Sequence, residues 1–257
     1  MKQLTVAILF GGKSGEHEVS VASAQSVIKN IDRQKFKVMP VGITKEGRWL
    51  TGKQVQYLPV GPLQQVASSD QAIEPVNLDD LPSKIDVVFP LLHGPCGEDG
   101  TIQGFLDLIN LPYVGSGVLG SALGMDKIAQ KQLLTQQGLP VVPWVWWLRK
   151  EIKKDVDKAV ESIEQALSYP MFVKPANLGS SVGINKAHNR QELKRFLEEA
   201  GLYDRKILIE QGLENIKEIE VSVLGNDEPA ASVCGEIVAS NEFYDYNAKY
   251  VDGKSES

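Results

Sequence analysis

The start of the chain limits its fold most. Leu4 to Phe10 is a nearly unbroken apolar run that ends at Gly11-Gly12. Such a run is typical of a strand in a parallel sheet whose two faces are both covered. Apolar residues at helical spacing follow between Glu18 and Ile28, and further strands are predicted at Phe36 to Ile43 and Ile85 to Leu92. Strands that alternate with helices predict a parallel α/β sheet.

Two polar, glycine-rich loops follow strands of this sheet, at residues 11–20 and 93–101. Function in open α/β sheets collects at the carboxyl ends of strands. Glu16 in the first loop is a candidate to pair with a substrate ammonium, although an acid there could also simply complement the helix dipole. His93 in the second could place a hydrogen bond or a positive charge near a carboxylate, or belong to an ordinary capped loop. His17 is expected to face solvent.

The second half of the chain predicts an antiparallel sheet with helices. Asp126 can cap a helix that reaches Gln137 and ends at Gly138. Further helices are expected at Asp155–Leu167 and at Gln191–Ala200, the latter stopped by Gly201. The expected strands are Pro140–Leu148, Met171–Lys174, Val182–Lys186, Lys206–Gln211, Glu218–Leu224 and Ala231–Ala239, with a short one near Val55–Val60.

The segment from Phe172 to Gly183 is the most informative for function. It places Lys174 at the end of a strand, directly before a Gly/Ser loop. Backbone N–H groups and hydroxyls of such a loop can surround phosphate oxygens. It is not a P-loop, because there the lysine follows the glycines and a helix begins beneath them. The alternative is an ordinary hairpin turn.

Three other residues support a nucleotide site. Lys127 opens a helix and could neutralise phosphates, as a compact charge does. Glu210 ends one strand and Glu218 opens the next, where carboxylates could reach an adenine edge and the ribose hydroxyls. The alternatives are a surface lysine and two solvated acids.

Composition narrows the function classes. The net charge is −6 at pH 7 and Lys and Arg do not cluster, so nucleic acid is not an expected partner. No apolar run approaches the length of about 18 residues that a membrane span needs. The N-terminus does not resemble a signal peptide. Cys96 and Cys234 form neither a zinc pattern nor a disulfide framework, so reduced thiols and a cytoplasmic location are expected.

Five ordered motifs together resemble the D-alanine–D-alanine ligases of the ATP-grasp superfamily. They cover nearly all of the 257 residues: Gly11-Gly12 with Glu16 to Ser20, His93-Gly94 with Gly97 to Thr101, Met125 to Lys127, Val173 to Pro175 with Gly179 to Gly183, and Tyr244 to Tyr246 with Ala248 to Tyr250.

The resemblance implies an α/β fold. A parallel-sheet pre-ATP-grasp domain at residues 1–120 would hold the substrate side. ATP-grasp α+β domains would follow, a central lid at 121–211 and a C-terminal domain beginning at 212–257, the latter truncated. The family also suggests a homodimer.

The resemblance also implies an activity: ADP-forming, ATP-dependent ligation of two D-alanines through an acyl phosphate, for peptidoglycan synthesis in the cell wall. Glu16 would hold the first ammonium in a triad with Ser180 and Tyr250, and His93 would lie near the first carboxylate. Lys127, Lys174 and Lys249 would contact phosphates, and Ser181 and Gly183 would belong to the loop that closes over ATP. Glu210 and Leu213 would bound the adenine and Glu218 the ribose.

Two further expectations concern the C-terminal side. The family pattern runs roughly 100 residues beyond Ser257 and there carries the ligands for Mg²⁺ or Mn²⁺, so these 257 residues are expected to hold no metal site and to lack ligase activity by themselves. Tyr250 favours D-alanyl-D-alanine over D-alanyl-D-lactate, because the depsipeptide-forming relatives have Phe at that place.

Two other interpretations stay open. One is an ATP-grasp ligase for other substrates, similar to biotin carboxylase or glutathione synthase. The loop around Glu16 and the segment from Tyr244 to Tyr250 argue against it, because both belong to the substrate side. The other is a non-catalytic nucleotide-binding protein.

Overall fold

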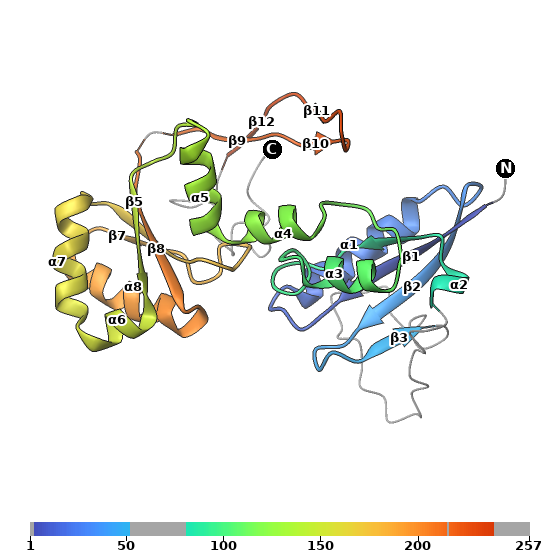
Figure 1. The fold of residues 1–257 in the computed structure, drawn as a ribbon, viewed down its shortest axis with the longest axis horizontal. Helices are drawn as coiled ribbons and strands as arrows, with labels where there is room; N and C mark the ends of the chain where they lie inside the picture. The colour runs from blue at the N-terminus through green and yellow to red at the C-terminus, as the bar shows by residue number, and fades with distance from the viewer. Residues whose placement is uncertain (1–2, 52–80, 215, 239–257) are drawn as a thin grey trace. The chain divides into compact units, whose positions relative to one another are not determined.

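A computed structural model describes residues 3–51, 81–214 and 216–238 of the chain. The chain divides into two compact units, Met1–Gln130 and Lys131–Ser257, which are described separately (Figure 1). The strand expected near residues 55–60 lies outside the described residues. None of the helices in the described ranges is long and apolar enough to cross a lipid bilayer.

The first unit contains a four-stranded sheet in the order β3-β2-β1-β4. The strands are β1 (Leu4–Gly11), β2 (Phe36–Ile43), β3 (Trp49–Thr51) and β4 (Val87–Pro90). β1 is parallel to both β2 and β4, whereas β3 pairs antiparallel with β2, beside it in Figure 1. The parallel sheet predicted from the sequence is thereby confirmed. The helices are α1 (His17–Asn30), α2 (Leu81–Lys84), α3 (Thr101–Leu108), α4 (Val118–Met125) and α5 (Lys127–Gln136), which crosses into the second unit.

Both faces of β1 are buried because helices cover them. Leu9 belongs to one hydrophobic core together with Leu106 of α3. Its neighbour Phe10 belongs to a different core together with Val21 of α1. Successive side chains of a strand point to opposite faces of the sheet. The unbroken apolar run of β1 is therefore what a strand between two helical layers requires.

The second unit contains an antiparallel sheet in the order β5-β8-β6-β7. Its helices contribute to one hydrophobic core, in which Ile163 of α7 and Leu197 of α8 join Val173 and Ile209 of the sheet. Two further antiparallel pairs, β9 with β12 and β10 with β11, follow in the chain. The elements are β5 (Trp144–Leu148), α6 (Arg149–Lys154), α7 (Val156–Ala166), β6 (Met171–Pro175), β7 (Asn185–Ala187), α8 (Arg190–Tyr203), β8 (Lys206–Gln211), β9 (Glu218–Glu220), β10 (Val223–Leu224), β11 (Ala230–Ala231) and β12 (Gly235–Ile237).

Several predicted boundaries are wrong. Helix α8 continues through Gly201 to Tyr203, because Gly201 is buried inside the helix and its carbonyl accepts a hydrogen bond from Arg149 Nη1 at 3.2 Å. The expected strands at 218–224 and 231–239 are each interrupted, giving β9 with β10 and β11 with β12. Helix α4 forms in a glycine-containing stretch for which the sequence predicted no helix.

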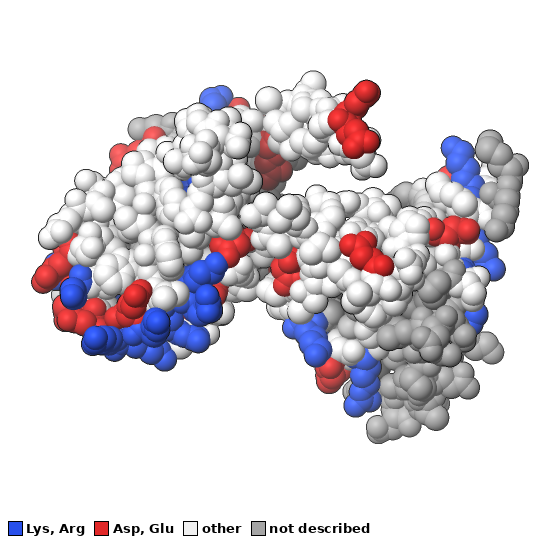
Figure 2. Space-filling model, viewed as in Figure 1, with Lys and Arg blue, Asp and Glu red and all other residues white. Residues whose placement is uncertain are grey.

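Charged side chains on the second unit are mixed in sign. Arg190 pairs with Glu164 at 2.5 Å and Lys194 pairs with Asp157 at 3.0 Å, joining α8 to α7. Figure 2 shows Lys and Arg side chains interspersed with Asp and Glu where these helices are exposed.

Candidate functional site

Glu16 lies where the two glycine-rich loops of the first unit meet. It is the N-cap residue of α1 and is 4% exposed, yet its side chain makes no capping hydrogen bond. The carboxylate lies against the backbone of Gly94, where a β-carbon would be only 2.1 Å from Glu16 Oε2. Gly94 also has a φ of +69°, which favours glycine. The second loop thus allows the Glu16 carboxylate to approach it closely.

His93 is held between two side chains. Its Nε2 lies 3.2 Å from Ser23 Oγ, and its Nδ1 lies 3.8 Å from Glu98 Oε1. Interaction with the Glu98 carboxylate raises the pKa of His93, partial burial opposes this, and the charges of Glu98 and Glu16 add to the increase. The Gly94 N–H donates to Glu98 Oε2 at 2.8 Å, which fixes that carboxylate. The arrangement favours a cationic imidazole near Glu16.

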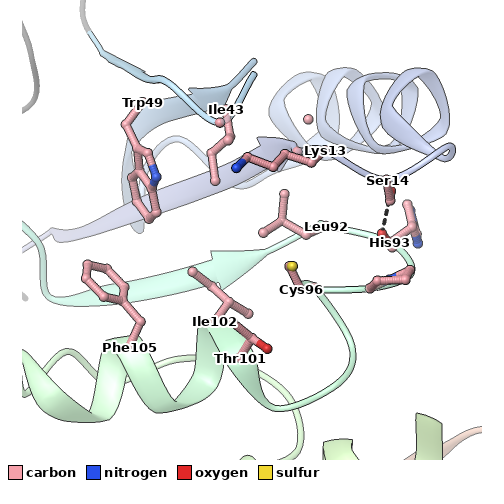
Figure 3. A pocket seen from close by; sticks show the side chains of 15 residues that line it. Lys13, Ser14, Ile43, Trp49, Leu92, His93, Cys96, Thr101, Ile102 and Phe105 are labelled. Carbon is pink, nitrogen blue, oxygen red and sulfur yellow. Dashed lines mark hydrogen bonds between the residues drawn. The ribbon is translucent and has the colours of Figure 1, made fainter. Parts of the chain in front are cut away.

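A cavity of about 340 Å³ adjoins His93 in the first unit. Figure 3 shows Trp49 and Phe105 at one end of it and Ser14 and His93 at the other. The two aromatic rings lie with their centroids 5.5 Å apart, and Ser14 Oγ donates to the His93 carbonyl at 2.8 Å. The cavity is therefore apolar at one end and polar beside His93.

The expectation that His17 faces solvent is wrong. The side chain is 1% exposed, and its Nδ1 lies 2.7 Å from the Gly12 carbonyl, to which it donates. Its Nε2 is buried and has no hydrogen-bond partner among the described residues. The first turn of α1 packs beneath the loop after β1, so local polarity did not decide the exposure of this residue.

The buried acid Glu210 dominates the site in the second unit. Glu210 lies opposite Phe172 in the β6–β8 register and is 7% exposed. Lys131 Nζ of α5 lies 2.5 Å from its Oε1, and the Lys174 ammonium pairs with its Oε2. Burial opposes ionisation most strongly, but the two lysines together hold the pKa of Glu210 below its ordinary value. The alternative that Glu210 is a solvated acid is therefore wrong.

Three of the predicted nucleotide-binding residues line one cavity. It has a volume of about 650 Å³ and includes Glu210, Leu213 and Glu218, with Phe172 and Lys186 beside them. The Lys174 and Lys186 ammoniums lie 5.3 and 5.9 Å from the centroid of the Phe172 ring. Cations, an aromatic face and carboxylates around one cavity suit a nucleotide, since they offer partners for phosphate, base and ribose.

The loop between β6 and β7 has an unusual backbone. Ser180 and Ser181 have φ values of +49° and +60°, in the left-handed region that non-glycine residues rarely adopt. Gly183 follows at +71°, where a β-carbon would lie 2.9 Å from both Pro175 and Tyr203. Such conformations concentrate at ligand clamps. The loop directly follows Lys174, so the hydroxyls and the lysine of the predicted phosphate site are adjacent in the chain.

Of the remaining predicted site residues, only Lys127 lies within the described part of the chain. Lys127 is the first residue of α5, and Asp126 caps that helix as predicted, by accepting from the N–H groups of Ile128 and Ala129. Lys249 and Tyr250 lie outside the described residues. Sequence reasoning missed Lys131, although it follows Lys127 at the helical spacing of four. It also gave no role to Glu98 and Ser23, whose contacts with His93 join separate segments.

Two family models match the chain. The model described as "D-ala D-ala ligase N-terminus" matches residues 5–116, and that described as "D-ala D-ala ligase C-terminus" matches residues 133–257. Curated relatives include the D-alanine–D-alanine ligases of Natranaerobius thermophilus, 50% identical over 99% of this chain, and of Thermoanaerobacter sp., 51% identical over 98%. This chain spans 72% of the length of each.

Solved structures of ligases with related names also resemble this chain. The VanG D-Ala:D-Ser ligase from Enterococcus faecalis is 34% identical, with a TM-score of 0.79 over 99% of this chain and 76% of that one. The D-alanyl-alanine synthetase A from Vibrio cholerae is 31% identical, with a TM-score of 0.76 over 100% of this chain and 74% of that one. With two family models and relatives at half identity, this chain belongs to the D-alanine–D-alanine ligase family.

Proposed function

We propose that this protein joins two D-alanines to D-alanyl-D-alanine with ATP as the source of energy, for peptidoglycan synthesis. Family membership supports the reaction, and the two sites described above support separate binding of the two kinds of substrate. The first unit binds the amino acid and the second binds the nucleotide.

On the substrate side, opposite charges recognise a zwitterionic amino acid. The Glu16 carboxylate pairs with the ammonium of the first D-alanine, and cationic His93 pairs with its carboxylate. The proximity of the Glu16 carboxylate to Gly94, next to His93, supports this assignment. Glu98 and Ser23 keep the imidazole oriented. Ser180 and Tyr250 complete the triad with Glu16 in this proposal.

On the nucleotide side, Glu210 and Leu213 bound the adenine and Glu218 binds the ribose hydroxyls. Their position around one cavity supports this. Lys127, Lys174 and Lys249 contact the phosphates, together with the loop that carries Ser180, Ser181 and Gly183. Closure of that loop would exclude water, which protects a reactive acyl phosphate from hydrolysis.

The chemistry takes two steps. A carboxylate oxygen of the first D-alanine attacks the γ-phosphorus of ATP, the bond to the β–γ bridging oxygen breaks, and ADP leaves. The amine of the second D-alanine then attacks the acyl carbon of the acyl phosphate. The tetrahedral adduct expels inorganic phosphate, and the amine loses a proton as the peptide bond forms. Lysine ammoniums stabilise the charge that accumulates on the phosphoryl oxygens.

Mg²⁺ or Mn²⁺ is expected from the resemblance. In the described part of the chain, no group of three or more His, Cys, Asp or Glu side chains could hold a metal ion. No step above is therefore assigned to a metal ion.

The observation that carries the proposal is the ion-paired Glu210 carboxylate, which lines the nucleotide cavity and contacts Lys174. Lys174 in turn precedes the loop in which Ser180 and Ser181 have positive φ values. The test uses protein expressed from its own gene. ATP-dependent phosphate release should require D-alanine, be absent with L-alanine, and accompany D-alanyl-D-alanine detected by mass spectrometry. D-serine and D-lactate, offered as second substrates, should compete poorly. Phosphate release without dipeptide would refute the proposal.

Assembly and location are also proposals. We infer a homodimer in the cytoplasm, as the family resemblance suggests. Sedimentation equilibrium at micromolar concentration should give twice the mass of one chain, and cell fractionation should recover the protein with soluble enzymes. A concentration-independent monomer mass would contradict the dimer.

A further inference from the structure

The ion-pair cluster around Glu210 contains two lysines, and only Lys174 is assigned to phosphate in the proposed function. The carboxylate is buried between Lys131, on helix α5, and Lys174, at the end of strand β6. The Lys131 side chain is 13% exposed and that of Lys174 is 23% exposed. The more exposed side chain is therefore that of Lys174, which precedes the Ser180–Gly183 loop in the chain, and the more buried one is that of Lys131 on the helix.

Binding a nucleotide creates a conflict in this cluster. In the proposed function Lys174 contacts phosphates, but in the structure its ammonium is engaged with Glu210. If Lys174 turned to a phosphate and no other cation were present, an ionised carboxylate would remain buried without a counterion. Removing one partner of a buried ion pair is strongly unfavourable for this reason.

We propose that Lys131 is a positioning residue, the permanent counterion of Glu210 that lets Lys174 exchange the carboxylate for nucleotide phosphate. This inference rests on the proposed nucleotide site. Lys131 keeps Glu210 charged and directed at the adenine side of the cavity in both states. Lys174 alternates between Glu210 and phosphate. It pairs with Glu210 only while no nucleotide is bound.

The geometry supports separate roles for the two lysines. Lys131 and Lys174 contact different carboxylate oxygens, Oε1 and Oε2, so one ammonium can leave without displacing the other. Lys174 also lies near the Phe172 ring, on the sheet face that carries Glu210. Of Lys131, Lys174 and Glu210, only Glu210 is among the described residues that line the nucleotide cavity. In this proposal Lys131 therefore acts on the nucleotide through Glu210, whereas Lys174 leaves Glu210 to reach a phosphate.

The test compares ADP with adenosine, which lacks the phosphates. Dissociation constants of both are measured by calorimetry for the wild type, Lys131→Met and Lys131→Arg. Lys131→Met should weaken ADP about tenfold or more, while adenosine changes by less than about threefold, since only ADP requires Lys174 to leave Glu210. Lys131→Arg should restore most of the ADP affinity. Lys194→Met is the matched control, because it removes an exposed ion pair with Asp157 and should change neither ligand.

A double-mutant cycle isolates the charge of Glu210. In a Glu210→Gln background, Lys131→Met should no longer lower the ratio of ADP to adenosine affinity, because no buried carboxylate remains to be neutralised. An equal loss for ADP and adenosine in Lys131→Met would instead mark Lys131 as merely structural and overturn the inference. Failure of the wild type to bind ADP at all would overturn the proposed function itself.

A structure of the wild type with ADP tests the inference without any variant. Lys174 Nζ should lie within hydrogen-bond distance of a phosphate oxygen, while Lys131 still contacts Glu210. If Lys174 stays on Glu210, or if Lys131 is the lysine that moves, the exchange does not occur and the inference is wrong.

Discussion

At the residue scale, Glu98 is the neighbour that raises the pKa of His93 most. Glu98 lies beside the imidazole and is itself fixed by the Gly94 N–H. Because the pKa of His93 is raised in the folded protein, the cation contributes stability below the ordinary histidine pKa, and that contribution is lost as the pH rises through the folded value. Below the pKa that His93 has in the folded protein, the same cation would bind the substrate carboxylate.

Replacing Glu98 by Gln should therefore shift the pH dependence. In Glu98→Gln the pKa of His93 should fall, so the alkaline limb of D-alanine binding should move to lower pH. The amide oxygen can still accept from the Gly94 N–H, which limits structural damage. The pH profile of kcat/KM for D-alanine measures the shift. Glu46→Gln, an exposed acid in the same unit, is the control, and identical profiles for both variants would contradict the role of Glu98.

Gly94 should tolerate no side chain. Gly94→Ala places a β-carbon against the Glu16 carboxylate at a backbone conformation that alanine adopts only with strain. We expect a loss of about 1–3 kcal/mol in unfolding free energy and weaker D-alanine binding. Gly124→Ala is the contrast: this exposed glycine of α4 has open space around it, and the change should stabilise by about 0.5–1 kcal/mol. Urea denaturation of both variants checks the prediction.

At the element scale, α7 and α8 pack against the antiparallel sheet that carries Glu210. Asp155 and Asn189 cap these helices, accepting from the N–H groups of Lys158 and Glu192. Their apolar faces pack on one face of the sheet, so Val173 and Ile209 point into the core while Lys174 and Glu210 point to the opposite face. Two-residue periodicity thus separates the structural side chains of β6 and β8 from the functional ones.

Truncating the packed face of α7 should destabilise the second unit. Ile163 has no exposed surface, so Ile163→Ala should cost about 2–5 kcal/mol in unfolding free energy from lost burial and the cavity it leaves. Leu202→Ala on α8 is the control, since Leu202 is 77% exposed and its loss should stay within about 0.5 kcal/mol. Equal destabilisation by both variants would mean that α7 does not pack as described.

At the scale of the whole molecule, the two ligands should act on different units. ADP should slow amide hydrogen exchange in residues 172–184 and 206–214, where the phosphate loop and part of the nucleotide cavity lie. D-alanine alone should slow exchange in residues 12–20 and 91–100 of the first unit. Exchange measured by mass spectrometry with each ligand separately resolves this. Protection by ADP confined to the first unit would reverse the proposed assignment.

Much of this architecture could be predicted because it depends on short-range rules. The apolar run of β1 predicted a strand buried on both faces, and Asp126 and Gly138 predicted the limits of α5 to within a residue. In other places, glycine was a misleading signal. Gly201 looked like a helix stop, but burial and a contact with Arg149 hold it inside α8, and the low helix propensity of glycine costs only about 1 kcal/mol.

The sequence by itself determined the alternation of elements, the two loops that carry Glu16 and His93, and the position of Lys174 before its loop. Only the tertiary structure decided that His17 is buried and that Glu210 is an ion-paired acid and not a solvated one. The physical reason is the range of the interactions. Helix caps and apolar periodicity act within a few residues of the chain. The ion pairs of Glu210, in contrast, involve lysines from separate elements, which approach it only once α5, β6 and β8 have packed together.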